Sequence, residues 1–193
     1  MNAGANQQIY IVISQTGTLL SRILKIVTHK EYNHVSVSLE PNLDKMYSFG
    51  RKNPYNPFRG GFVQESPHAG TFKRFSETKV VVLAVQTSKL NYHSMQMFLE
   101  NMYRNKHIYC YNYIGLMLAA FRICYTHKNH YYCSEFVRDL LLKFKVVDDQ
   151  EFSPITHPMQ FLHLNDAKVV YKGKLKNFYL NPVIDTDYQL VAE

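Results

Sequence analysis

The residues of this sequence best suited to covalent chemistry are a cysteine and a histidine that lie far apart in the chain. Cys133 follows Tyr132 and opens a stretch with helical periodicity, so we expect it in the first turn of a helix. A cysteine attacks as its thiolate, which a helix N-terminus and a neighbouring imidazole both favour. His34 is the candidate imidazole, because it lies on the polar face of an alternating strand. A helix packed across that strand would bring the two side chains together.

A nucleophilic pair of this kind needs a third group to orient the imidazole. The next expected strand carries Tyr47 and Ser48, which face opposite sides, so only one of them shares the side of His34. Glu40 has the parity of His34 but lies some ~20 Å further along an extended strand. Ser48 is therefore the preferred orienter. A hydroxyl can hold the ring by a hydrogen bond but cannot stabilise imidazolium by charge.

Hydrophobic periodicity predicts an α+β fold around these residues. Strands are expected at residues 8–14, 34–39, 45–49, 79–86 and 168–171. The strand at 79–86 is expected to be central, and 34–39 is expected to pair antiparallel with 45–49. Helices are expected from 18 or 21 to about 28, at 88–106, at 112–121 as a buried helix, and at 133–144. The segment 50–70 is rich in Gly, Pro and Asn and is expected to be a loop.

Length and composition predict one globular domain spanning residues 1–193. Of the 193 residues, 46% are apolar and 19% are charged, which excludes disorder as the main state. We find no apolar stretch of the ~18 residues that a membrane span needs, and no export or lipidation signal, so a cytoplasmic location is expected. The odd count of three cysteines then favours free thiols, with Cys110 and Cys124 in the core. The formal charge of +7 is spread along the chain without a nucleic-acid motif, so nucleic acid is not an expected partner.

Three segments carry a resemblance to a known family. They are Asn33-His34-Val35-Ser36-Val37-Ser38-Leu39, Met46-Tyr47-Ser48-Phe49-Gly50-Arg51 and Tyr132-Cys133-Ser134-Glu135-Phe136-Val137. Together they resemble the circularly permuted papain-like cysteine hydrolases. These are the YaeF/YiiX-like bacterial proteins, related to NlpC-type cell-wall peptidases and to lecithin:retinol acyltransferase. In this group the His strand precedes the Cys helix, as it does here. The resemblance extends from about residue 9 to 158.

This resemblance implies a permuted papain-like (NlpC-type) fold with an antiparallel sheet packed against helices, and an acyl-transfer reaction. Cys133 corresponds to the nucleophile and His34 to the general base, while Ser48 stands where the family often has Glu. The reaction would cleave an amide or ester through a thioester, with the Cys133 N–H as an oxyanion donor. No metal or organic cofactor is implied. The substrate would be a peptide, an isopeptide or a lipid acyl group, with Tyr47, Arg51, Tyr132 and His157 near it.

Two other interpretations remain open at the sequence level. Cys124, His127, His130 and Cys133 stand at three-residue steps and would form a structural zinc site if a loop brought them together. Alternatively, the chain is a non-catalytic lipid- or peptide-binding module on the same fold, using the aromatic segment 55–62. Arg51, Lys52 and Arg59 would then meet a carboxylate or an anionic head group, which includes peripheral contact with an anionic membrane.

Overall fold

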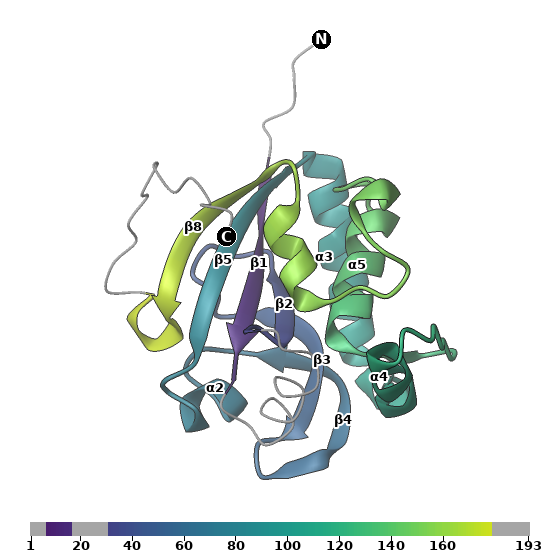
Figure 1. Cartoon of the computed structure of the whole chain (residues 1–193). Helices are drawn as coiled ribbons and strands as arrows, with labels where there is room; N and C mark the ends of the chain where they lie inside the picture. Colours follow the sequence, from purple (N-terminus) through teal and green to yellow (C-terminus); the bar gives the residue numbers. More distant parts are fainter. Residues whose placement is uncertain (1–6, 17–30, 179–193) are drawn as a thin grey trace.

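A single mixed β-sheet of eight strands organises the computed structural model, which describes residues 7–16 and 31–178 (Figure 1). The strand order is β7-β6-β4-β3-β2-β1-β5-β8, and every neighbouring pair is antiparallel except β6 and β7, which are parallel. The strands are β1 (Gln7–Gln15), β2 (His34–Ser38), β3 (Met46–Asn53), β4 (Asn56–Glu65), β5 (Lys79–Thr87), β6 (Cys110–Tyr111), β7 (His130–Tyr131) and β8 (Ala167–Lys174).

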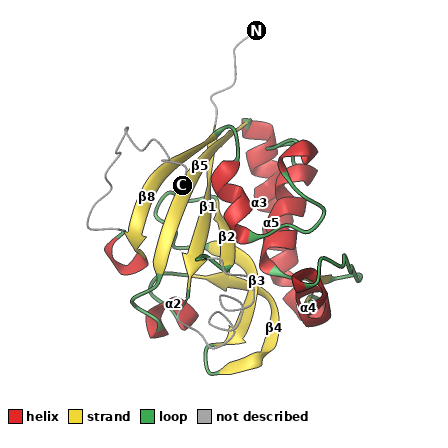
Figure 2. Ribbon diagram, in the orientation of Figure 1, coloured by secondary structure: helices red, strands yellow, loops and turns green. Residues whose placement is uncertain are grey.

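Helices gather mainly on one face of this sheet, as Figure 2 shows for α3 and α5. Helix α5 packs against β2 and β3, and α3 packs against β1 and β4. The α-helices are α2 (Gly70–Arg74), α3 (Lys89–Arg104), α4 (Tyr113–Ala120) and α5 (Cys133–Lys143), and the 3₁₀ segments are η1 (Lys106–Ile108), η2 (Asp149–Glu151), η3 (Pro158–His163) and η4 (Leu175–Asn177). None of the helices in the described part of the chain combines the length and apolar composition needed to cross a bilayer.

The strand periodicity explains how the sheet supports a core on both faces. Alternate residues of β1, β2 and β5 face α3 and α5, among them Ile11, Val37 and Leu83. Residues of the opposite parity, such as Val12 and Val82, pack with Phe72 of α2 on the other face. In β2 the residues of the other parity, among them His34 and Ser36, are polar and alternate with the aliphatic Val35 and Val37.

Most expected elements are confirmed, with small changes of boundary. The antiparallel pairing of β2 with β3 is confirmed, with Val37 opposite Tyr47. Asn112 caps α4 as expected, because its Oδ1 accepts from the backbone N–H of Gly115 at 2.8 Å. The helix expected from residue 18 or 21 to about 28 lies outside the described residues.

Four expectations are wrong. Residues 50–70 do not form a loop, because β3 continues to Asn53 and turns into the ten-residue strand β4. Strand β5 is next to the sheet edge rather than central, and its apolar run reflects burial on both faces. Helix α4 is not buried, since Ile114 and Met117 are 61% and 65% exposed. Cys110 and Cys124 are exposed rather than in the core.

Phe49 of β3 joins the sheet to the helical layer. Its ring is fully buried and contacts the rings of Phe62 on β4 and Phe136 on α5, at centroid distances of 5.6 and 5.2 Å. The same ring also meets Tyr131, which lies two residues before Cys133. The position of the Cys133 helix over β3 and β4 therefore depends on this aromatic cluster.

Replacing Phe49 with Ala tests this dependence. We expect the free energy of unfolding to fall by about 3–5 kcal/mol, because a large cavity opens between sheet and helix. Phe58→Ala is the matched control: Phe58 is 85% exposed on the neighbouring strand, and its loss should change stability by about 0.5 kcal/mol or less. Urea denaturation measures both. Equal losses for the two variants would contradict the proposed role of Phe49.

Candidate active site

A buried histidine–carboxylate pair lies at the start of β2. His34 Nε2 is 3.1 Å from Oε2 and 3.2 Å from Oε1 of Glu65, and the two side chains are only 14% and 12% exposed. Ser36 donates a hydrogen bond from its Oγ to Glu65 Oε2 at 2.6 Å. Ser48 Oγ lies 3.4 Å from His34 Nε2 but donates to the carbonyl oxygen of Val35 at 3.0 Å. The closest acidic partner of the imidazole is therefore Glu65, with Ser48 as a longer contact.

Glu65 is a functional candidate that the sequence reasoning missed. It is the last residue of β4, opposite Met46 of β3, and it has the parity of Ser48 and Gly50. Gly50 leaves room for the pair, since a Cβ there would lie 3.1 Å from Glu65 Oε1 and 3.6 Å from His34 Cε1. A second strand after 45–49, paired antiparallel with it, would have pointed to Glu65, because Val63 and Glu65 then share the face of Ser48. The Gly, Pro and Asn content of that segment instead predicts a loop.

Cys133 lies at the first turn of α5, as expected from the sequence. The backbone N–H of Tyr132 donates a hydrogen bond to the carboxylate of Glu135 at 3.3 Å, which is one half of a capping box at the start of α5. Burial raises the pKa of Glu135 to about 7, against the backbone hydrogen bond that lowers it. Ser134 Oγ donates to the carbonyl oxygen of Thr156 at 2.7 Å and ties the helix start to the segment that follows α5. The Cys133 residue is 4% exposed.

The Cys133 thiol lies within side-chain hydrogen-bonding reach of two groups, the ring of His34 and the hydroxyl of Tyr111. Glu65 and the serines surround Nε2 of His34. The other ring nitrogen, Nδ1, is therefore the one left for Cys133. This arrangement places a carboxylate, an imidazole and a thiol in one line of contacts, which is the order that an activated cysteine nucleophile requires.

The charge state of His34 follows from its surroundings. Burial lowers the pKa of His34, but the Glu65 carboxylate and the Cys133 contact outweigh burial and raise it to about 10. The imidazole is thus protonated at neutral pH. The protonated ring and the N-terminus of α5 both place positive potential beside the Cys133 sulfur.

Tyr111 is a second residue that the sequence reasoning missed. Strand β6 places it beside β7, where Tyr111 pairs with Tyr131, two residues before Cys133. Tyr111 also packs directly on Gly60 of β4, since a side-chain Cβ added at Gly60 would lie only 2.7 Å from the Cβ of Tyr111. Burial, followed by the proximity of Cys133, raises the pKa of Tyr111 well above its usual value. The phenol therefore keeps its proton and can donate a hydrogen bond to a negative oxygen near the thiol.

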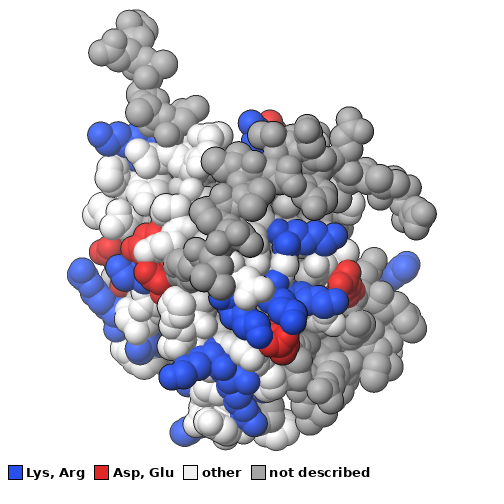
Figure 3. All heavy atoms as spheres, turned by 90° about the vertical axis from the view of Figure 1, so that its left-hand side faces the viewer, with Lys and Arg blue, Asp and Glu red and all other residues white. Residues whose placement is uncertain are grey.

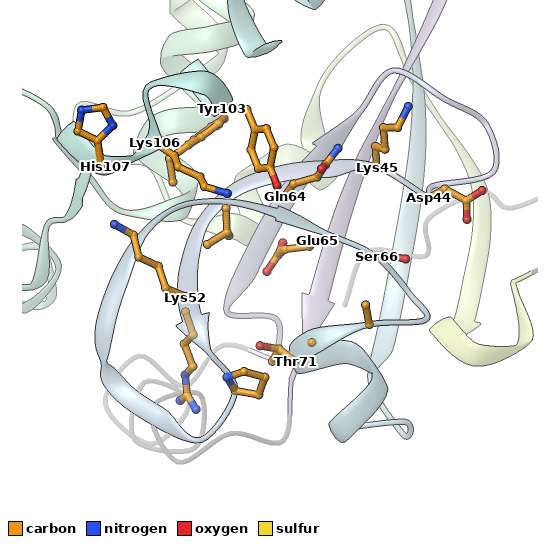
Figure 4. Close-up of a pocket in the computed structure, with 16 residues that line it drawn as sticks. Asp44, Lys45, Lys52, Gln64, Glu65, Ser66, Thr71, Tyr103, Lys106 and His107 are labelled. Carbon is orange, nitrogen blue, oxygen red and sulfur yellow. The ribbon is translucent and has the colours of Figure 1, made fainter. Parts of the chain in front are cut away.

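Two pockets adjoin these groups. A small pocket of about 70 Å³ opens at Cys133 and is lined by Tyr132 and His157, two of the expected substrate-binding residues, and by Leu116 and Ala119 of α4. A larger pocket of about 660 Å³ lies on the Glu65 side, where Arg51 is among the lining residues. Figure 4 shows the Glu65 carboxylate in the middle of this larger pocket, with Lys52 and Lys106 on one side of it.

The remaining predicted site residues are not all close to Cys133. Tyr47 is buried in the core and stacks on Phe62, so it does not line the small pocket. The proposed zinc ligands do not converge, because Cys133 faces His34 whereas His127 and His130 contact each other through Nδ1 atoms 2.9 Å apart. Within the described residues, no group of three or more His, Cys, Asp or Glu is placed to hold a metal ion.

Comparisons of the chain with protein-family models, with curated proteins and with solved structures found no match.

Glu65→Gln tests which residue controls the imidazole. Removing the charge while keeping the shape should lower the pKa of His34 from about 10 by about 1–3 pH units, which an NMR titration of the ring protons measures. Ser48→Ala is the control. It should shift the pKa of His34 much less, because the Ser48 hydroxyl donates mainly to a backbone carbonyl. A larger shift in Ser48→Ala than in Glu65→Gln would return Ser48 to the role of orienter.

Proposed function

We propose that the protein is a cysteine hydrolase or acyltransferase that cleaves an amide or ester through a thioester on Cys133. The single observation that supports this most is the contact chain from Glu65 through His34 to Cys133 at a helix N-terminus. The order of the chain, with the His strand before the Cys helix, is that of the permuted papain-like hydrolases that the sequence resembles. We therefore propose that the sheet and helices described above have the permuted papain-like topology.

In the first half of the reaction, Cys133 Sγ attacks the carbonyl carbon of the substrate as a thiolate. The resulting oxyanion is held by the backbone N–H of Cys133 and by the hydroxyl of Tyr111. His34 then gives its proton to the leaving amine or alcohol, the bond to the leaving group breaks, and a thioester remains on Cys133. Because His34 is already protonated at neutral pH, its first role is that of general acid.

In the second half, the now neutral His34 takes a proton from water or from an acceptor alcohol or amine. The activated oxygen or nitrogen attacks the thioester carbonyl, and the acyl group leaves Cys133 as an acid, ester or amide. Sγ departs as a thiolate beside a protonated His34, which restores the starting state. Glu65 is a positioning residue throughout, since it holds the ring and stabilises its positive charge.

The substrate class is a peptide, an isopeptide or a lipid acyl group. The small pocket beside Cys133 admits only a few atoms of it, and its apolar wall includes Leu116 and Ile155. The alternative of a non-catalytic binding module drew on the serine at the third position and on the aromatic segment 55–62. Glu65, 3.1 Å from His34, supplies the carboxylate that the serine lacks, so the first of these two grounds no longer favours that alternative.

Alkylation by iodoacetamide tests the activated thiol. Exposed Cys110 and Cys124 serve as internal controls, because accessibility alone would make them react faster than buried Cys133. We expect Cys133 to react at least as fast as either control at pH 7, and His34→Ala to slow it by roughly tenfold or more without changing the other two. Mass spectrometry of the three peptides gives the rates. A Cys133 rate below both controls and unaffected by His34→Ala would overturn the proposed thiolate.

Turnover of a panel of activated esters and peptide amides tests the reaction itself. We expect Cys133→Ser to abolish hydrolysis and Cys110→Ser to leave it unchanged. Activity should fall as the pH rises through about 10, because His34 then loses the proton that the leaving group needs, and Glu65→Gln should move this decline to lower pH. Tyr111→Phe should reduce kcat by roughly tenfold to a hundredfold, with a smaller effect on KM. Hydrolysis that survives Cys133→Ser would contradict the mechanism.

A further inference from the structure

Helix α4 breaks the usual rule for a surface helix. All eight of its residues, Tyr113-Ile114-Gly115-Leu116-Met117-Leu118-Ala119-Ala120, lack a charged or amide side chain. Ile114 and Met117 are nevertheless 61% and 65% exposed, and Phe121 directly after the helix is 72% exposed. These three residues follow the i, i+3, i+7 spacing of one helix face. In Figure 1 the helix projects from the side of the molecule.

The exposed apolar surface continues beyond the helix. Residues 121–128 are all exposed, and among them Ile123 and Tyr125 are 51% and 38% exposed. We call the five residues Ile114, Met117, Phe121, Ile123 and Tyr125 the α4 face. Contiguous exposed apolar side chains of this kind mark interaction surfaces or membrane contacts rather than ordinary protein surface.

The segment of chain that carries the α4 face contains basic residues but no acidic ones. The stretch from residue 101 to 134 contains no Asp or Glu, whereas Arg122 and Lys128 stand in the exposed segment itself. Apolar side chains flanked by arginine and lysine are suited to the boundary between anionic head groups and acyl chains. A second copy of this chain would instead bring like charges together at the same place.

We propose that the α4 face docks on the surface of an anionic phospholipid bilayer. A helix of eight residues is far too short to span a bilayer, so α4 would lie in the head-group region with Met117 and Phe121 inserted. The opposite side of the helix carries Leu116 and Ala119, which line the pocket at Cys133. Docking therefore holds that pocket close to the lipid surface. The docking goes beyond the proposed reaction and does not depend on it.

Vesicle co-sedimentation tests the proposal, using phosphatidylcholine vesicles with and without phosphatidylserine. We expect binding only when phosphatidylserine is present, and weakening as salt is raised. Met117→Asp should weaken binding by about tenfold to a hundredfold. Met97→Asp is the matched control, because Met97 is 72% exposed on α3, outside the α4 face, and its replacement should leave binding unchanged. Both sites are exposed, so circular dichroism should show both variants folded.

A charge control separates the α4 face from the other basic surface of the molecule. Figure 3 shows Lys and Arg side chains gathered on the side that faces left in Figure 1, where β8 lies, whereas α4 is on the right of Figure 1. The double variant Arg122→Glu/Lys128→Glu should lose binding by about tenfold or more. Lys168→Glu/Lys172→Glu, on exposed positions of β8, should retain it.

Three results would overturn the proposal. They are the absence of binding to phosphatidylserine vesicles, equal binding by Met117→Asp and Met97→Asp, and a wild-type dimer in light scattering that Met117→Asp converts to a monomer. Cys133→Ser should bind vesicles like the wild type. Loss of docking without loss of thiol reactivity, or the reverse, therefore shows which of the two proposals has failed.

Discussion

The contact between His34 and Glu65 is the interaction on which the candidate site depends. A protonated imidazole with so little exposure would be costly if it stood alone, and the Glu65 carboxylate within 3.1–3.2 Å of Nε2 compensates that charge. Ser36 and Ser48 supply hydroxyls around the same pair, and Gly50 keeps the space beside it free of a side chain. With Nε2 engaged in this way, Nδ1 is the ring nitrogen left for Cys133. The protonation of His34 and the direction of its free nitrogen thus have one common cause.

Long-range packing brings this pair to the thiol. Strands β3 and β4 form a long hairpin that carries Glu65 at one end and Gly60, next to Tyr111, in the middle of β4. The buried ring of Phe49 holds α5 against this hairpin, and the pairing of β6 with β7 places Tyr111 beside the residues that lead into Cys133. Each member of the site therefore comes from a different element. A shift of one residue in the pairing of β4 with β3 would turn Glu65 away from His34, because alternate residues face opposite sides of the sheet.

This dependence on pairing explains what the sequence could and could not predict. The alternation of His34, Ser36 and Ser38 with Val35 and Val37 is local, so the face of His34 was predictable, and the start of α5 at Cys133 was predictable from the helical period after it. Glu65 and Tyr111 depend on strand partners that are distant in sequence. The Gly, Pro and Asn residues of 50–70 are also typical of a loop. In the structure, Gly50 leaves room for the side chain of Glu65, and Gly60 leaves room for Tyr111. The sequence predicts Ser48 instead, because its strand is the one whose pairing with β2 can be inferred locally.

Helix α4 is an element for which the sequence predicted burial and the structure shows exposure. Its apolar composition predicted burial, yet its outward face is exposed, which gives no benefit to the stability of the isolated chain. Natural sequences usually agree with their structures at every level, and the places where they disagree tend to be functional. Polar residues at 114, 117 and 121 would leave Leu116 and Ala119 free to line the pocket at Cys133. The lining of the pocket therefore does not explain the apolar outward face, and this mismatch is what supports the proposed contact with a lipid surface.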